Sequence, residues 1–272
     1  MRTEKNQINF YRNNNIEIVW GKSVHSFPMH SHDSLCLGIV TGGRIRYKLS
    51  NREYVLGKSQ VYIIPPFTEH TILLADGEPY SYCAICIHGQ FKPAAGILSL
   101  PSMVIEDERA GQELLEKCRL YSSTQDSRQF STEMLEFIHR HGGEITFGKQ
   151  QSKEYVASAV CYIKEHSSEP FSLQELCNYT HVTKYHLSRA FKEQMGVSPY
   201  QYYIQEKVRS VKQGLSQARS NVDITYDLSF SDQSHLCNTF KKHVGLTPKQ
   251  YKKSYIEEQA LEQCRYKFGQ NI

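Results

Sequence analysis

The feature that most constrains the fold is a short motif that occurs twice in the second half of the chain. Residues 191–203 read FKEQMGVSPYQYY, and residues 240–251 read FKKHVGLTPKQY. Both contain Phe-Lys, a glycine, a hydroxyl residue followed by proline, and a tyrosine, and the two copies are 49 residues apart. Duplication at a fixed period marks a repeated supersecondary unit. The sequence therefore predicts two copies of one helical unit.

Each copy has the signals of two short helices joined by a tight turn. In the first copy, Ser172 and Glu175 form a capping-box pattern, and Thr183 is placed to cap the following helix. Such a pair is the helix-turn-helix motif, whose second helix enters the major groove of DNA. One long helix over about 199–215 would join the copies and hold their recognition helices about one DNA turn apart, roughly 34 Å.

The charge distribution agrees with a DNA-binding second half. Residues 1–151 carry 16 Lys and Arg against 16 Asp and Glu, whereas residues 172–255 carry 12 against 6. A neutral first half and a basic second half indicate a sensor joined to an anion-binding module.

The segment 155–255 resembles the DNA-binding domain of the AraC/XylS family of bacterial transcription regulators, and SDQSHLCNTFKKHVGLTPKQY is its most specific part. Five positions depart from the family pattern, among them Thr225 and Cys177, where alanine is usual, and Leu236, where phenylalanine is usual. Ser229-Phe230 stands where the family has Gly-Phe, and Lys207 stands where an arginine is common. The resemblance implies double-stranded DNA as a partner and makes RNA polymerase a further candidate partner.

The resemblance also implies which side chains contact DNA. Arg189 is our preferred guanine reader, because its planar fork can bond O6 and N7 together, and Gln233 and Asn238 could read adenine. Lys241 and Lys242 are expected to hold phosphate. The complete set of base-facing candidates is Lys184, Tyr185, Ser188, Arg189, Gln233, Ser234, His235 and Asn238.

The first half has a different pattern. Between about 16 and 90, short runs rich in β-branched and aromatic residues alternate with Gly- and Pro-containing turns, which predicts a small antiparallel barrel or jelly roll. After Pro101, two stretches with helical apolar spacing follow, and 144–152 is the expected linker. We expect three parts: a sensor barrel over 1–100, a helical dimerisation segment and linker over 101–151, and the DNA-binding domain over 152–272.

The stretch PMHSHDSLCLGIVTGG, residues 28–43, resembles the histidine motif of cupin-type sensor domains. His30, His32, Cys36 and His70 keep the spacing of that motif, with cysteine in the place of glutamate. We expect the first three on one face of one strand region and His70 from a neighbouring hairpin. Three imidazoles and a thiolate suit Zn²⁺, Fe²⁺, Co²⁺ or Ni²⁺. The alternatives are a metal-free pocket for an organic effector, or a structural role.

The other histidines and cysteines give weaker indications of a functional site. His88 ends a strand and is expected to be exposed. Cys83 and Cys86 form a Cys-x-x-Cys pair, but in a strand residues three apart point to opposite faces, which argues against a shared site. The start of the chain lacks the apolar stretch of a signal peptide, and we expect a cytoplasmic protein.

These patterns predict a two-domain α+β protein, with an N-terminal cupin-like β-barrel carrying helices and a C-terminal all-α domain with two helix-turn-helix motifs. The function indicated is a ligand-responsive, DNA-binding transcription regulator, expected to be a homodimer through its first half and not an enzyme. The alternative is a metal-dependent, dioxygenase-like cupin enzyme with a helical appendage. The duplicated motif weighs against that alternative, because an enzyme has no use for paired recognition helices.

Overall fold

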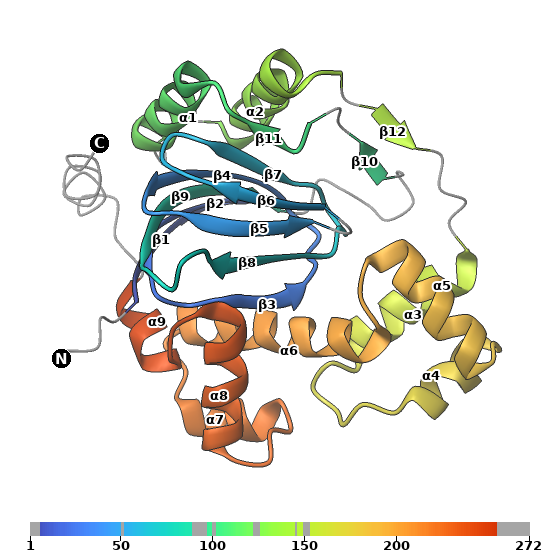
Figure 1. Cartoon of the computed structure of the whole chain (residues 1–272). Helices are drawn as coiled ribbons and strands as arrows, with labels where there is room; N and C mark the ends of the chain where they lie inside the picture. The colour runs from blue at the N-terminus through green and yellow to red at the C-terminus, as the bar shows by residue number, and fades with distance from the viewer. Residues whose placement is uncertain are drawn as a thin grey trace.

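A computed structural model of the chain describes residues 6–49, 52–88, 97–99, 102–121, 126–144, 146–148 and 153–254. A β-barrel is covered on one side by two helices, and a helical half lies against its other side (Figure 1). Within the described residues, no helix is long and apolar enough to cross a membrane.

The barrel consists of two antiparallel sheets. The six-stranded sheet has the order β1 (Gln7–Asn13), β2 (Ile16–Ser23), β9 (Tyr80–Ile87), β4 (Leu35–Gly42), β7 (Val61–Ile64), β11 (Val104–Ile105). The four-stranded sheet has the order β3 (Phe27–His30), β8 (His70–Leu74), β5 (Ile45–Leu49), β6 (Arg52–Leu56). A separate pair joins β10 (Ile97–Ser99) to β12 (Thr146–Gly148). The predicted antiparallel barrel is confirmed.

Two helices cover the outer face of the six-stranded sheet. Helices α1 (Glu108–Leu120) and α2 (Ser127–Gly142) place Leu114, Met134 and Phe137 in one apolar cluster with the sheet residues Trp20 and Ile85. The apolar stripes predicted for these helices therefore form core with the barrel, which accounts for their helical spacing.

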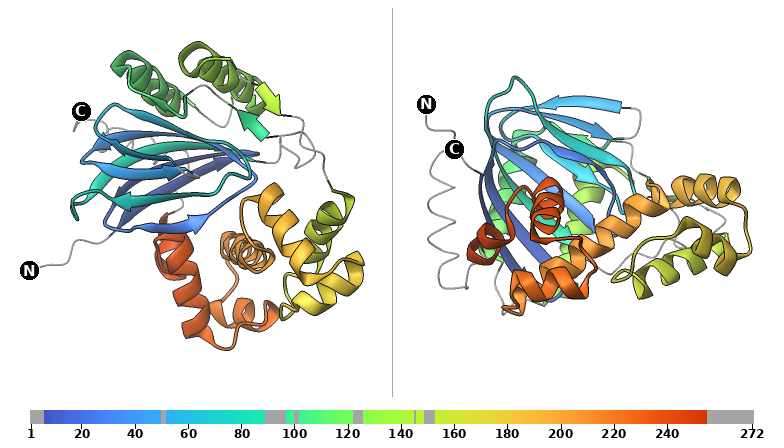
Figure 2. Two further views of the ribbon diagram at one scale, coloured as in Figure 1. Left: turned by 45° about the vertical axis from the view of Figure 1, so that its right-hand side comes forward. Right: turned by 90° about the horizontal axis from the view of Figure 1, so that it is seen from below.

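The helical half contains α3 (Glu154–Glu165), α4 (Leu173–Thr180), α5 (Lys184–Met195), α6 (Pro199–Ser216), α7 (Asn221–Asp227), α8 (Gln233–Val244) and α9 (Pro248–Ser254). The pairs α4–α5 and α7–α8 are the two helix-turn-helix units. The long helix α6 runs between them in every view (Figure 2). This arrangement confirms the two helical units and the long joining helix.

Equivalent residues of the two copies make equivalent contacts. The rings of Phe191 and Tyr202 lie 5.6 Å apart, and those of Phe240 and Tyr251 lie 5.2 Å apart, both edge to face. Tyr202, rather than Tyr203, is therefore the partner that corresponds to Tyr251.

The ends of the recognition helices also repeat. Gly196 and Gly245 end α5 and α8 with φ of 74° and 80°. Ser198 and Thr247 each accept a hydrogen bond from the backbone N–H three residues on, at Gln201 and Gln250. Of the caps expected from sequence, Ser172 bonds the backbone of Glu175. Thr183 occupies the N-cap position of α5 without a side-chain cap bond, so that expected bond is absent.

The two units differ in how they join the barrel. The first has its own core, which includes Leu187 and Phe191. The second shares one continuous apolar cluster with the barrel interior, and the Phe10 ring on β1 lies 5.0 Å from the ring of Tyr251. The second unit is thus the one packed more intimately with the sensor.

Candidate nucleic-acid interface and effector pocket

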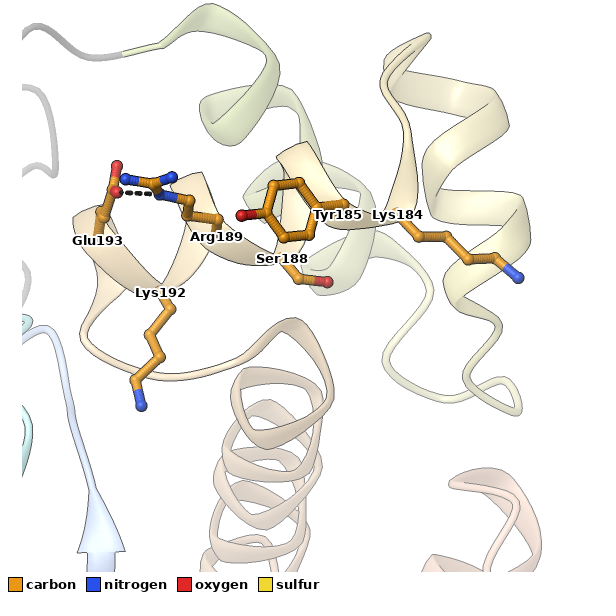
Figure 3. A pocket seen from close by; sticks show the side chains of 6 residues that line it. All are labelled: Lys184, Tyr185, Ser188, Arg189, Lys192 and Glu193. Atoms are coloured by element: carbon orange, nitrogen blue, oxygen red, sulfur yellow. Dashed lines mark hydrogen bonds and ion pairs between the residues drawn. The ribbon is translucent and has the colours of Figure 1, made fainter.

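The outer face of α5 presents the predicted first set of DNA-contacting side chains. Lys184, Tyr185 and Arg189 are exposed, and Ser188 is half-buried. With Lys192 and Glu193 they surround a shallow hollow on the helix surface, open to solvent (Figure 3). The structure therefore brings the four predicted residues together on one accessible face, as major-groove contact requires.

Arg189 has an intramolecular partner on this face. Its Nε lies 3.0 Å from Oε1 of Glu193, one helical turn on (Figure 3). Nζ of Lys153 lies 3.5 Å from the other oxygen of Glu193. An exposed pair of this kind contributes little to stability, because solvent screens the two charges. The Arg189 guanidinium can therefore leave Glu193 and bind a DNA base at a small cost in free energy.

The second set lies at the start of α8. Gln233, Ser234 and Asn238 are exposed, and so are Lys241 and Lys242 nearer the helix end. His235 is also exposed, but its ring packs on Phe230 and its Nδ1 lies 3.1 Å from the Ser231 hydroxyl. His235 is therefore held in place before any DNA contact.

The turn before α8 shows how the chain accommodates its departures from the family pattern. Ser229, in the usual glycine position, adopts the left-handed conformation with φ of 48°. Lys207 is buried in α6, donates a hydrogen bond to the Ser229 carbonyl at 3.2 Å, and lies over the Phe230 ring. Helix α6 thus fixes the turn that determines the position of the second recognition helix, α8.

The barrel contacts the carboxyl-terminal ends of both recognition helices. The Ser31 hydroxyl donates to the Met195 carbonyl at 2.8 Å, and the Asn6 side chain donates to the Gly245 carbonyl at 2.6 Å. These carbonyls lie at equivalent ends of the two copies, where helical carbonyls lack intrahelical partners. The sensor therefore holds both recognition helices at defined positions.

Charged pairs reinforce the contact with the first unit and the linker helix. Lys192 Nζ lies 3.8 Å from Glu69, and Arg209 of α6 lies 3.0 Å from Asp33. Gly196 approaches the barrel so closely that a β-carbon there would lie 2.6 Å from the Phe67 carbonyl oxygen. The sequence pattern predicted neither these contacts nor the side of the barrel that meets the helices.

A cavity of about 500 Å³ lies between the barrel and α6. Its volume is within the range of small-molecule sites. Residues from three regions line it, including Arg12, Glu17, His30, His32, Asp33, Cys36, Cys86 and His88 from the barrel, Tyr202, Arg209 and Lys212 from α6, and His243 from α8. His88, expected to be exposed, is half-buried at this cavity. The barrel interior behind it is filled by tyrosines, including Tyr47 and Tyr62.

His30 and His32, which line the cavity, converge with the buried His70. Each offers a ring nitrogen, and these nitrogens lie within 4.8 Å of one another, close enough to hold a metal ion. The expectation of one strand region is wrong, because β3 ends at His30 and β4 begins at Leu35. The histidines meet because β3 pairs with β8, which sets His30 opposite His70, and because the turn after β3 carries His32.

The three imidazoles are oriented alike. Their Nδ1 atoms lie 2.7–2.9 Å from the carbonyl oxygens of Pro28, Ser34 and Thr68. A backbone carbonyl only accepts, so each Nδ1 carries a proton and Nε2 is the ring nitrogen left to act as a ligand. In His32 this nitrogen also lies 3.8 Å from Sγ of Cys36. Burial lowers the pKa of His30 to about 3 and lowers that of His70, which keeps both rings neutral.

Cys36 touches this group only at its edge. Its Sγ lies 3.8 Å from Nε2 of His32 but 3.0 Å from Sγ of Cys86. Burial alone would raise the pKa of Cys36, yet the hydrogen bond with Cys86 and the charge of His32 hold it well below its usual value. The structure therefore groups three of the four predicted ligands and gives Cys36 a second thiol as its nearest partner.

Sequence reasoning missed Lys212 and Cys86. Lys212 is half-buried, faces the cavity, and lies 5.6 Å from the centre of the Phe10 ring. Among the described residues, no carboxylate forms an ion pair with it. Helical spacing alone would have placed Lys212 one turn after Val208 on the same face of α6, but not against the barrel.

Two helix-turn-helix units on one linker helix, and a sensor barrel whose cavity lies against that helix, define a ligand-binding transcription regulator. The family model for the AraC-like ligand binding domain matches residues 17–138, and that for a helix-turn-helix domain matches residues 176–254. The chain belongs to the AraC family of transcriptional regulators.

Individual relatives agree with this assignment. The uncharacterized HTH-type transcriptional regulator YbfI of Bacillus subtilis is 27% identical over 78% of this chain and 82% of its own length. The raffinose operon regulatory protein RafR of Pediococcus pentosaceus is 21% identical over 82% and 86%. A structure of apo ToxT from Vibrio cholerae covers 92% of this chain and 96% of its own, with a TM-score of 0.60 at 13% identity, which shows a shared fold.

Proposed function

We propose that this regulator responds to an effector bound in the cavity between the barrel and α6. The observation that carries the proposal is that α6 both lines the cavity and joins the two helix-turn-helix units. An effector there would contact the element that sets the distance between the recognition helices. Differential binding to two arrangements of that helix would shift the population that fits DNA.

The cavity favours a small organic anion. Lys212 supplies a cation without a carboxylate partner among the described residues, and Arg12 lines the same cavity. Arg209 contributes less, because Asp33 and Glu206 already neutralise it. ToxT structures contain an unsaturated fatty acid and a substituted butenoic acid, both carboxylic acids, and their fold supports the same class of effector here.

A panel of carboxylates screened by thermal shift tests this assignment. An acid that stabilises the wild-type protein should lose most of its effect with Lys212→Met. Lys249→Met, an exposed position on α9, should leave the shift unchanged. Equal stabilisation of wild type and Lys212→Met by every active acid would reject the anion assignment.

A second candidate is a metal effector on His30, His32 and His70. The three Nδ1–carbonyl bonds favour it, because they occupy Nδ1 and leave Nε2 as the ligand atom of each ring for a divalent ion such as Zn²⁺, Fe²⁺, Co²⁺ or Ni²⁺. A bound ion would supply a Lewis-acidic binding point beside Lys212. Protein prepared without chelator should then contain about one metal per chain, and His70→Asn should reduce it whereas His186→Asn should not. Metal below about a tenth of an equivalent would reject this candidate.

The residue roles in DNA binding remain proposals. Arg189 reads guanine, Gln233 and Asn238 read adenine, and Lys241 and Lys242 hold phosphate. The exposure of all five side chains supports these roles.

Assembly is also a proposal. With the apolar stripes of α1 and α2 turned to the sheet, a homodimer would use their outer faces, where Leu120 is 77% exposed. Sedimentation of the full chain should give a dimer, and Leu120→Glu should weaken it. A monomer at micromolar concentration would contradict the assembly proposed here.

A further inference from the structure

We propose that Cys36 and Cys86 form a peroxide-reactive dithiol that closes to a reversible disulfide in the wall of the cavity. Neither thiol belongs to the group of three histidines, and the inference requires neither a metal nor an organic effector. It rests on strand register, on sulfur separation and on access from the cavity.

Strand register places the two cysteines face to face. Cys36 on β4 is directly opposite Cys86 on β9. Directly opposite residues of an antiparallel pair have α-carbons about 4.5–5.5 Å apart, inside the range of about 4.4–6.8 Å that disulfides span. The sulfurs already lie 3.0 Å apart as free thiols. Closing the bond therefore requires a small side-chain movement and no backbone rearrangement.

The neighbours of the pair favour reaction at Cys36. The Ser34 hydroxyl lies 3.5 Å and the His32 ring nitrogen 3.8 Å from its sulfur, and both can stabilise a sulfur anion by hydrogen bonding. Both cysteines line the cavity, so a molecule as small as hydrogen peroxide can reach them. Cys83 and Cys118 are instead fully buried in the cluster between the sheet and α1.

The reaction balances with peroxide as the oxidant. The Cys36 sulfur attacks one peroxide oxygen, the O–O bond breaks, and the leaving hydroxide takes the thiol proton to become water. The Cys86 sulfur then attacks the sulfur of the resulting sulfenic acid. The S–O bond breaks, and the departing hydroxide takes the Cys86 proton as a second water. Two thiols and one peroxide thus yield one disulfide and two waters, with peroxide reduced by two electrons.

The disulfide would alter the sensor where it meets the linker helix. A sulfur bonded to Cys86 can no longer donate to or accept a proton from His32, and His32 lines the same cavity as Lys212. The modification therefore lies where it can change occupancy of the cavity.

Thiol counting and peptide mapping on the full-length protein test the proposal. The reduced chain has eight cysteines, so titration after denaturation should give eight thiols before a mild peroxide dose and six after it. Dithiothreitol should restore eight. The linked peptide should join Cys36 to the peptide that carries Cys83 and Cys86, persist in Cys83→Ser, and vanish in Cys86→Ser.

Two controls keep the result decisive. Cys161→Ser, at an exposed position of α3, should lose its own thiol and still form the disulfide. If Cys36→Ser fails to fold, Cys86→Ser alone carries the test. Eight remaining thiols, a bond between other cysteines, or irreversible oxidation of Cys36 without a link to Cys86 would each overturn the proposal.

Discussion

Substituting alanine for Gly196 and, separately, for Gly245 tests how the barrel holds the helix-turn-helix units. Both glycines end a recognition helix in the left-handed conformation, with φ of 74° and 80°. Each substitution should therefore lose about 1–2 kcal/mol from backbone strain alone. The two positions consequently serve as matched controls for one another.

Their surroundings differ. A β-carbon at Gly196 would lie 2.6 Å from the Phe67 carbonyl oxygen and 3.0 Å from the Glu69 nitrogen, which are backbone atoms of the barrel. At Gly245 the nearest atoms belong to the side chains of His25, Asn6 and Ile8, at 3.3–3.5 Å, and can move aside. Overpacking costs about 1–3 kcal/mol more, so Gly196→Ala should lower the free energy of unfolding by about 2–5 kcal/mol in total unless the domains separate.

Urea denaturation and small-angle scattering measure the two outcomes. Gly196→Ala should be the less stable variant, or should show a larger radius of gyration because the first helix-turn-helix unit has left the barrel. Gly245→Ala should keep the wild-type radius. Equal loss of stability with unchanged radius in both variants would refute the proposed contact between α5 and the barrel.

Further predictions concern DNA binding and pH. Arg189→Ala should weaken binding to a specific site by about 1–3 kcal/mol and relax preference at one base pair. Lys242→Ala should weaken binding to all sequences and lower the slope of log affinity against log salt concentration by about one. If Arg189→Ala left operator affinity unchanged, the assignment of the first recognition helix would be wrong. Burial, with a contribution from Lys242, lowers the pKa of His243 to about 4, below its unfolded value of 6.5. The unfolded state then binds more protons between pH 4 and 6.5, so stability should fall as pH drops through that window. His243→Gln should flatten this part of the stability profile, and an unchanged acid dependence would contradict the neutral burial of His243.

The sequence predicted the elements that depend on local pattern. The repeat that pairs Phe191 with Phe240 predicted two equivalent helical units, because caps, glycines and apolar spacing are local signals. The spacing of His30, His32 and His70 was enough to group them, although the argument from one continuous strand was wrong. Their approach depends on the pairing of β3 with β8 and on the turn after β3.

Contacts between distant segments could not be read from the sequence. Asn6 and Gly245 are 239 residues apart, and Ser31 and Met195 are 164 apart, yet each pair forms a hydrogen bond. The pairing of Cys36 with Cys86 depends on the register of β4 on β9, which no local spacing fixes. Lys212 belongs to the cavity only because α6 lies against the barrel. Domain docking and strand register therefore define the parts of the site that sequence reasoning missed.

Selection from random duplex DNA, with the full-length protein and two variants, tests the central claim most directly. If α5 and α8 each read one half-site from a common linker helix, wild-type protein should enrich two short motifs whose centres lie about 10–10.5 base pairs apart. Arg189→Ala should lose preference in one motif only, and Asn238→Ala in the other only. Enrichment of a single motif that both substitutions affect equally, or no enrichment above non-specific DNA, would contradict reading by two recognition helices.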